Sequence, residues 1–248
     1  MAKGGGTSNG PMRDATQVKR MLAQEVETMY ARRSIAAVTA AIVLATLTSA
    51  SAAPNHVESG AFAGCPAHGS GGDPQVNKLK NRSTAPASTI PMTVAGVKQL
   101  PILPAATPTM RANWSASSRA TIEPHEGQGV VFTGYILQVA RETGEPSNCG
   151  STLPRDEDVE LFLAQRPGVT DGQQIILGEI TPRWRAAYTS WRPVNLRGVA
   201  GGRRIRITGW LLYDQESFGE THGGTATPWE IEPITNVEVL RNGNWGDL

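Results

Sequence analysis

The chain has 248 residues, of which 39% are hydrophobic and 6% are aromatic, and its 23 basic and 22 acidic residues nearly balance. This length fits one or two domains, and the balanced charge excludes a protein that holds nucleic acid through a strong overall positive field. Removal of residues 1–52 would take away six basic and three acidic residues and leave a formal net charge of about −2. Recognition of a polyanion would therefore need a local group of basic residues.

A signal peptide is predicted over residues 29–52. Arg32 and Arg33 precede a short apolar run over residues 35–48, and the small residues that follow favour cleavage after Ala52. Residues 1–28 lack these features, which suggests that translation starts further downstream, at Met21 or Met29. We expect an exported protein, periplasmic or secreted, by the general or the twin-arginine route. The alternative is a protein anchored in the membrane by an uncleaved signal segment.

Residues 53–120 are rich in Pro, Ala and Ser and predict an extended N-terminal strap. Within it, a short helix is predicted near residues 73–82, with Asp73 as N-cap and Pro74 at the first helical position. A turn-rich, solvated linker is the alternative interpretation of this stretch.

The two cysteines, Cys65 and Cys149, predict one disulfide in an exported chain. It would join the strap to the loop after the first predicted strand. His68 follows Cys65 by three residues, but Cys149 has no Cys or His at zinc-like spacing, so no metal site is predicted. No cofactor is predicted either.

Five strands are predicted between residues 121 and 242, with a short tail over residues 243–248. A connection of about twenty residues, with a helix around residues 184–188, separates the third strand from the fourth. Gly134 and Gly209 interrupt two strands of similar sequence, as bends in a small barrel do. The prediction is an all-β, five-stranded, OB-like Greek-key barrel with one or two short helices. The predicted strands are residues 129–140, 158–164, 174–180, 203–214 and 229–240, with Pro233 marking a break in the last.

Several stretches resemble a group of exported, OB-like bacterial proteins of uncharacterised function. The resemblance is carried by residues 65–82, 131–137, 180–185, 207–211 and 229–235. It implies export and the OB-like fold, and no activity. The group has His where this chain has Glu160 and Glu232, which puts any histidine-dependent chemistry of the group in doubt here.

Seven arginines lie between Thr181 and Tyr213 without an intervening acidic residue, and four aromatic residues are interleaved with them. Guanidinium groups bind phosphate or carboxylate, and aromatic faces stack on bases or sugars, so this pattern fits an anionic oligomer on an OB barrel. The alternative is structural, because Trp residues fill small cores and Arg stems cover apolar surface while their head groups pair with carboxylates such as Glu230 and Glu232. The candidate ligand-binding residues are Arg183, Arg185, Trp191, Arg192, Trp210 and His222.

We therefore predict an exported, non-enzymatic OB-fold binding module for single-stranded nucleic acid or an oligosaccharide. One alternative is a small metal-dependent hydrolase using Glu230, Glu232 and His222, with the acidic run at residues 156–160 as a second carboxylate group. Against it, carboxylates on solvent-facing strand positions are common. Another alternative is an envelope protein that pairs an exposed barrel edge with a partner strand.

Overall fold

The computed structural model describes residues 56–216, 225 and 227–248. The predicted signal peptide and His222 lie outside these residues. Within them, no helix combines the length and the apolar character needed to cross a bilayer.

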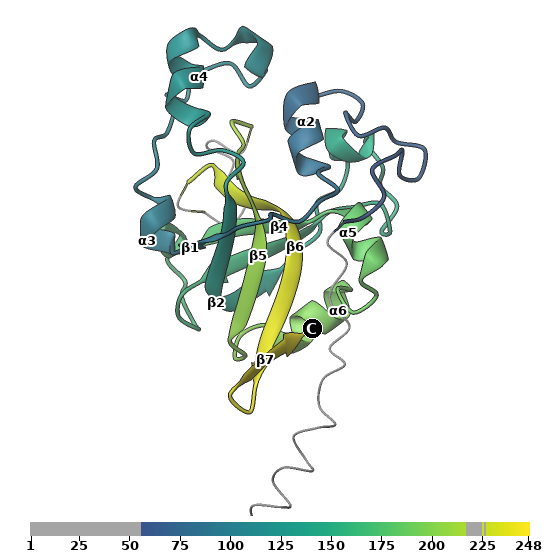
Figure 1. Ribbon diagram of the computed structural model, residues 1–248, viewed down its shortest axis with the longest axis vertical. Helices are drawn as coiled ribbons and strands as arrows, with labels where there is room; N and C mark the ends of the chain where they lie inside the picture. Colours follow the sequence, from purple (N-terminus) through teal and green to yellow (C-terminus); the bar gives the residue numbers. More distant parts are fainter. Residues whose placement is uncertain (1–55, 217–224, 226) are drawn as a thin grey trace, which may run out of the picture. The chain divides into compact units, whose positions relative to one another are not determined.

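Five strands close into a barrel in which each strand is hydrogen-bonded to two others (Figure 1). The order around the barrel is β2, β3, β4, β6, β5 and back to β2, and every pair is antiparallel except the parallel pair β4–β6. With a helical connection between β4 and β5, this is the Greek-key OB barrel, as predicted. The barrel strands are β2 (Gly129–Val139), β3 (Val159–Ala164), β4 (Ile176–Ile180), β5 (Ile205–Tyr213) and β6 (Trp229–Arg241).

Gly134 and Gly209 lie where the barrel strands bend. Strand β2 pairs with β5 up to Gly134 and with β3 from Tyr135 onward, so Gly134 marks the change of partner. A Cβ at Gly134 would lie 2.3 Å from the carbonyl oxygen of Ala164. At Gly209 the β5–β6 register shifts, and a Cβ there would lie 2.7 Å from the carbonyl oxygen of Pro233. Both positions bring two backbones too close for a side chain.

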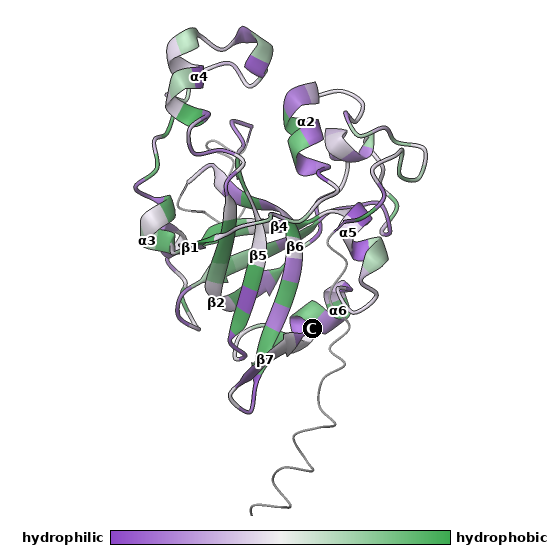
Figure 2. Ribbon diagram, in the orientation of Figure 1, coloured by the Kyte–Doolittle hydropathy of each residue, from purple (hydrophilic) through white to green (hydrophobic). Residues whose placement is uncertain are grey.

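The barrel core contains large aromatic residues from the strands and from the connection between β4 and β5. Trp184, Trp191, Tyr213 and Trp229 are fully buried. Hydrophobic and hydrophilic residues alternate along β5 and β6 (Figure 2), because alternate side chains of a strand face opposite sides.

Short helices are more numerous in the described residues than the one or two predicted. Each has only four to seven residues, too few to show a helical hydrophobic period. The helices are α2 (Pro74–Lys80), α3 (Val94–Val97), α4 (Ala116–Ile122), α5 (Pro182–Ala187) and α6 (Pro193–Val199), with the 3-10 turns η1 (Arg111–Asn113), η2 (Pro146–Asn148) and η3 (Gly172–Gln174).

The described part of the strap packs closely on the barrel. Strand β1 (Ile90–Met92) pairs in parallel with β2, and Val97 and Leu103 are buried in the barrel's own core. The Trp229 indole donates to the carbonyl oxygen of Pro101, at 2.8 Å. The strap therefore supplies part of the hydrophobic core, which its composition did not indicate.

The predicted disulfide between Cys65 and Cys149 is present. It links the strap just before α2 to the end of η2, in the loop between β2 and β3. The same two segments are joined by the side-chain amide of Asn81, which donates to the carbonyl oxygen of Ser147 at 2.8 Å.

The residues predicted as a tail form a seventh strand, β7 (Asn244–Asp247), which pairs antiparallel with β6. Asn242 and Gly243 connect the two strands with φ angles of 50° and 81°. Asn-Gly is the preferred pair for such a two-residue hairpin turn. The sequence therefore carried a signal for this strand that the prediction missed.

Candidate functional site

The five predicted ligand-binding residues that the structure describes do not form one site. Arg183 is buried, and its guanidinium donates to Asn81 Oδ1 at 3.0 Å and to the carbonyl oxygen of Cys65 at 3.2 Å. It thereby holds the strap against α5. His222 lies outside the described residues.

Both predicted tryptophans contact other parts of the protein, and Trp191 is fully buried. Trp191 is buried in the core with its ring stacked on Tyr188, at 3.8 Å between ring centroids. Trp210 donates its indole N–H to the carbonyl oxygen of Thr84, and the guanidinium of Arg82 lies 4.8 Å from its ring centroid. The aromatic residues of this region are therefore used to pack the protein.

The remaining two candidates, Arg185 and Arg192, line one surface groove of about 750 Å³, which we call the arginine groove. In the part of the chain that the structure describes, Asp156 is the only carboxylate residue that lines it. Its walls come from the β2–β3 loop, the α5–α6 region and residues 62–63. Its arginines are Arg141, Arg155, Arg185, Arg192 and Arg197.

The packing of α5 and α6 explains why arginines face this groove. Pro193, Leu196 and Val199 bury one side of α6, so Arg192 and Arg197 are left exposed. On α5, Trp184 is buried and donates its indole N–H to the carbonyl oxygen of Arg82 at 2.8 Å. The next residue, Arg185, lies on the groove.

Three of the five groove arginines have partners within the protein. Arg141 lies 3.4 Å from Glu157, and Arg155 lies 3.5 Å from Asp156 but is 80% exposed. Arg185 donates to the carbonyl oxygens of Pro154 and Arg155.

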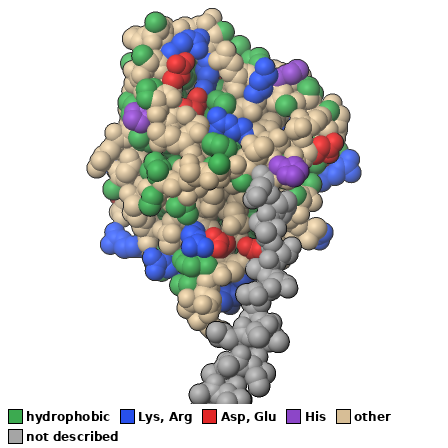
Figure 3. Space-filling view, viewed as in Figure 1, with side chains coloured by type: hydrophobic (Ala, Val, Ile, Leu, Met, Phe, Trp, Pro, Cys, Tyr) green, Lys and Arg blue, Asp and Glu red, His purple; other side chains and the backbone are tan. Residues whose placement is uncertain are grey.

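Arg192 and Arg197 differ from these three. Both are exposed, and among the described residues no carboxylate forms an ion pair with either of them. Elsewhere the surface is mixed: on the face seen in Figure 3, basic and acidic side chains are interspersed. The arginine groove is thus a local concentration of positive charge on a nearly neutral protein.

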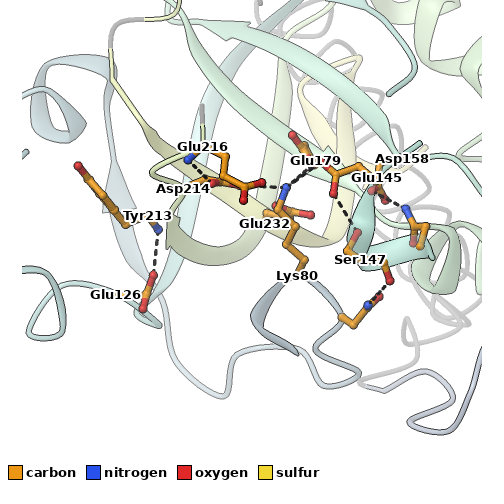
Figure 4. A network of polar contacts seen from close by, with 12 residues as sticks. Lys80, Glu126, Glu145, Ser147, Asp158, Glu179, Tyr213, Asp214, Glu216 and Glu232 are labelled. Carbon is orange, nitrogen blue, oxygen red and sulfur yellow. Dashed lines mark hydrogen bonds and ion pairs between the residues drawn. The ribbon is translucent and has the colours of Figure 1, made fainter. Parts of the chain in front are cut away.

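A second group of charged side chains surrounds Lys80, the last residue of α2. The Lys80 ammonium lies 3.1 Å from Asp214, 3.2 Å from Glu145, 3.5 Å from Glu232 and 3.9 Å from Glu179 (Figure 4). All five side chains are nearly or fully buried. We call these five residues the Lys80 cluster.

Local structure in α2 directs Lys80 inward. Asp73 caps the helix by accepting from the backbone N–H of Gln75 at 2.7 Å. Val76 and Lys80 are one helical turn apart and both are buried, so they share the face that meets the barrel. In the sequence, Lys80 follows Val76 by four residues and so shares the apolar face of the predicted helix. This spacing indicated a buried lysine, and the sequence prediction did not use it.

Further buried carboxylates continue from the Lys80 cluster toward the β2–β3 loop. Carboxylate oxygens of Glu142, Asp158 and Glu179 lie within 4.8 Å of one another, and so do those of Glu179, Glu230 and Glu232. Glu179 belongs to both groups. Asp158 is fully buried and accepts from the side-chain amide of Asn148 at 2.6 Å.

This arrangement changes how readily the carboxyl groups ionise. Burial, together with the charge of Glu179, raises the pKa of Glu142 to about 11. Burial also raises the pKa of Asp158 to about 7, and that of Glu232 well above its usual range. Burial lowers the pKa of Lys80, but the four surrounding carboxylates outweigh it and raise that pKa well above its ordinary value. Too many acidic groups share one lysine for all of them to be ionised without a further cation.

These positions differ from the solvent-facing carboxylates expected from the sequence. Glu230 and Glu232 are 2% and 0% exposed, and the acidic run over residues 156–160 is buried as well. Glu232 pairs with Lys80, not with an arginine. Strand periodicity shows which residues share a face, but not whether a distant segment such as α2 covers that face.

The fold and the groove define the class as an OB-barrel protein with an arginine-lined surface groove and a buried carboxylate cluster. No protein-family model matches the chain, and neither does any curated protein. The crystal structure of yeast Stn1 and Ten1 is similar to part of it, at 16% sequence identity and a TM-score of 0.27. The alignment covers 46% of this chain and 43% of that chain, so less than half of each is matched.

Proposed function

We propose that the protein is an exported, non-enzymatic OB-fold module that binds an anionic oligomer in the arginine groove. The observation that carries this proposal is the convergence of five arginines on one groove with a single lining carboxylate. Arg192 and Arg197 are the main ligand contacts, because among the described residues neither has a carboxylate partner. Arg185 lines the same groove and adds to its positive charge.

The groove favours recognition of charged groups over stacking of bases. Among the described residues, Phe62 is the only aromatic residue that lines it. The ring of Trp191 stacks on Tyr188, and the guanidinium of Arg82 lies over the ring of Trp210. The shared chemistry of the ligand is therefore a series of phosphate, sulfate or carboxylate groups, each of which a guanidinium can bind with two hydrogen bonds. Single-stranded nucleic acid and an acidic oligosaccharide both offer such a series.

The two alternatives have less support in the described residues. Glu232 is fully buried against Lys80, so a water molecule and a substrate do not reach it readily as a general base requires. The barrel is closed by the β2–β5 pair, which leaves the short strands β1 and β7 as the sheet edges within the described part of the chain. These two edge strands are only three and four residues long, so a partner strand could form few backbone hydrogen bonds with either of them.

Export is part of the proposal. The disulfide supports it, because disulfides persist in oxidising compartments outside the cytosol. Mass spectrometry of the protein purified from the cell envelope or culture medium tests it, with a mature N-terminus at Ala53 as the expected result. Recovery of an uncleaved chain from the membrane fraction would instead support the anchored alternative.

Binding is tested by titrating the protein with a labelled single-stranded oligonucleotide and with heparin over a series of salt concentrations. For the oligonucleotide we expect the logarithm of affinity to fall with that of salt, with a slope of about −0.7 for each phosphate contacted. The double variant R192Q/R197Q should reduce the slope by roughly one to two. R203Q/R204Q is the matched control, because it removes two charges from exposed arginines that do not line the groove.

Equal losses in the two double variants would show that only net charge matters and would overturn the groove assignment. Binding of heparin alone would assign the ligand to the acidic oligosaccharides, and binding of the oligonucleotide alone would assign it to nucleic acids. Failure of both probes to bind the wild-type protein at low salt would reject the proposed function.

A further inference from the structure

We propose that Glu142, Asp158 and Glu179 form a binding site for a divalent cation of the calcium and magnesium class. The site lies beside the Lys80 cluster and shares Glu179 with it. It is independent of the anionic ligand proposed for the arginine groove. It also departs from the sequence analysis, which predicted no metal site.

The distances suit a cation that is bound by oxygen atoms. One carboxylate oxygen from each residue lies within 4.8 Å of the other two. Two oxygen ligands of one Ca²⁺ ion, each bound at about 2.4 Å, are at most about 4.8 Å apart. The three side chains can therefore bind one ion after small rotations.

The backbone holds the three residues in register. Glu142 and Asp158 form an antiparallel bridge, in which the Glu142 N–H donates to the Asp158 carbonyl oxygen at 3.2 Å. Asp158 precedes β3, and Glu179 lies on β4, which pairs with β3 from Val159 onward. Glu179 is thus held by the barrel, and the backbone bridge holds Glu142 next to Asp158 in the β2–β3 loop.

Unpartnered oxygens provide a second, independent indication of a ligand. Asp158 is fully buried, and its Oδ1 has no hydrogen-bond partner among the described residues. Oε2 of Glu142 and Oε2 of Glu179 are buried there without a hydrogen bond as well. Buried polar atoms without hydrogen bonds cost free energy, and a bound cation would satisfy Oδ1 of Asp158 and Oε2 of Glu142. Oε2 of Glu179 lies 3.9 Å from the Lys80 ammonium and would be shared between the two cations.

The neighbouring charges leave room for such an ion. Lys80 is in contact with Glu179 but forms no ion pair with Glu142 or Asp158 in the described structure. Arg185 is near enough to lower the pKa of Asp158, yet the hydrogen bonds described for its guanidinium go to backbone carbonyls. Glu142 is partly buried as a residue, although its Oε2 is buried.

The ligand chemistry selects the class of cation. All three ligands are carboxylates, with no His nitrogen or Cys sulfur among them. Carboxylate oxygens suit Ca²⁺, Mg²⁺ and Mn²⁺ better than the softer transition metals. The competing explanation is that the carboxyl groups share protons and bind no metal.

Calorimetric titration of the EDTA-treated protein with CaCl₂, MgCl₂ or MnCl₂ distinguishes these explanations. We expect one site per chain and a dissociation constant below about 1 mM for at least one ion. The thermal unfolding midpoint should rise as the concentration of that ion increases. Absence of both effects with all three ions would reject the site and favour shared protons.

Variants locate the site. D158N and E142Q should each weaken binding at least about tenfold, whereas E123Q, which neutralises an exposed carboxylate at the end of α4, should leave it unchanged. Circular dichroism verifies the fold, and E142Q provides the test at the rim of the site if D158N does not fold. Unchanged binding in both variants would overturn the assignment. R192Q/R197Q should still bind the ion, so failure of this proposal is distinct from failure of the groove.

Discussion

The Lys80 ammonium lies 3.5 Å from a carboxyl oxygen of Glu232, between the end of α2 and the first part of β6. The strap therefore reaches the barrel through a buried charge as well as through apolar contacts. Three more carboxylates surround the same lysine, so its removal would leave several buried acidic groups without a cation.

Replacement of Lys80 by methionine should destabilise the protein by about 3–5 kcal/mol, the usual cost of breaking a buried pair. Urea unfolding at pH 7 measures the change. K78M is the matched control, because Lys78 lies on the same helix and is exposed, and it should change stability by less than about 0.5 kcal/mol. Similar losses in both variants would mean that the helix, and not the buried ammonium, is responsible.

The stability of the metal-free protein should decrease as pH rises above about 4.3, the ordinary pKa of a glutamate in an unfolded chain. Burial and the repulsion of Glu179 raise the pKa of Glu232, so the folded state keeps a proton that the unfolded state has released. Each such proton makes the free energy of unfolding fall by up to about 1.4 kcal/mol per pH unit.

E232Q keeps the shape of the side chain and removes its ionisation, so it should flatten part of this decrease. Urea unfolding in EDTA from pH 5 to pH 8 measures the slope. Part of the decrease should remain, because burial raises the pKa of Glu179 in the same direction. An identical slope in E232Q and the wild type would show that Glu232 is ionised in the folded protein.

Loss of the disulfide should destabilise the protein by about 4–5 kcal/mol in the chain-entropy model, because it closes a loop with a sequence separation of 84. Comparison of C65A/C149A with the wild type by urea unfolding tests this value. Dithiothreitol should reproduce the loss in the wild type and have no effect on the double variant. A wild-type protein as stable in reductant as without it would show that the strap is held by its other contacts.

Substitution of Gly209 by alanine should destabilise the barrel by about 1–3 kcal/mol, because the new Cβ would lie 2.7 Å from the Pro233 carbonyl oxygen and from Ile231 Cγ2. G198A is the control, since a Cβ on that residue of α6 meets nothing within 4 Å. It should be neutral or stabilising by up to about 1 kcal/mol, given the helix propensity of alanine. A neutral G209A would show that the two strands can separate at this bend at little cost.

The fold could be predicted because its signals are local. The alternation along the five strands and the two bending glycines are properties of a few consecutive residues. They located both ends of every barrel strand to within two residues. The site was harder to predict. Arg185 and Arg192 come from the predicted arginine run and line one groove, but Arg141 and Arg155 join that groove from a loop that lies far from them in the sequence.

The sequence by itself determined the barrel and the choice of disulfide partners, because strand periodicity, bending glycines and a count of two cysteines do not depend on distant contacts. Tertiary structure alone decided which charged residues are buried. In the sequence, nothing distinguishes Lys80, Asp158 and Glu232 from ordinary surface residues. In the structure, all three are buried. The physical reason is that desolvation and pairing depend on which segments meet in space, and chain-distant segments leave no common pattern in the sequence.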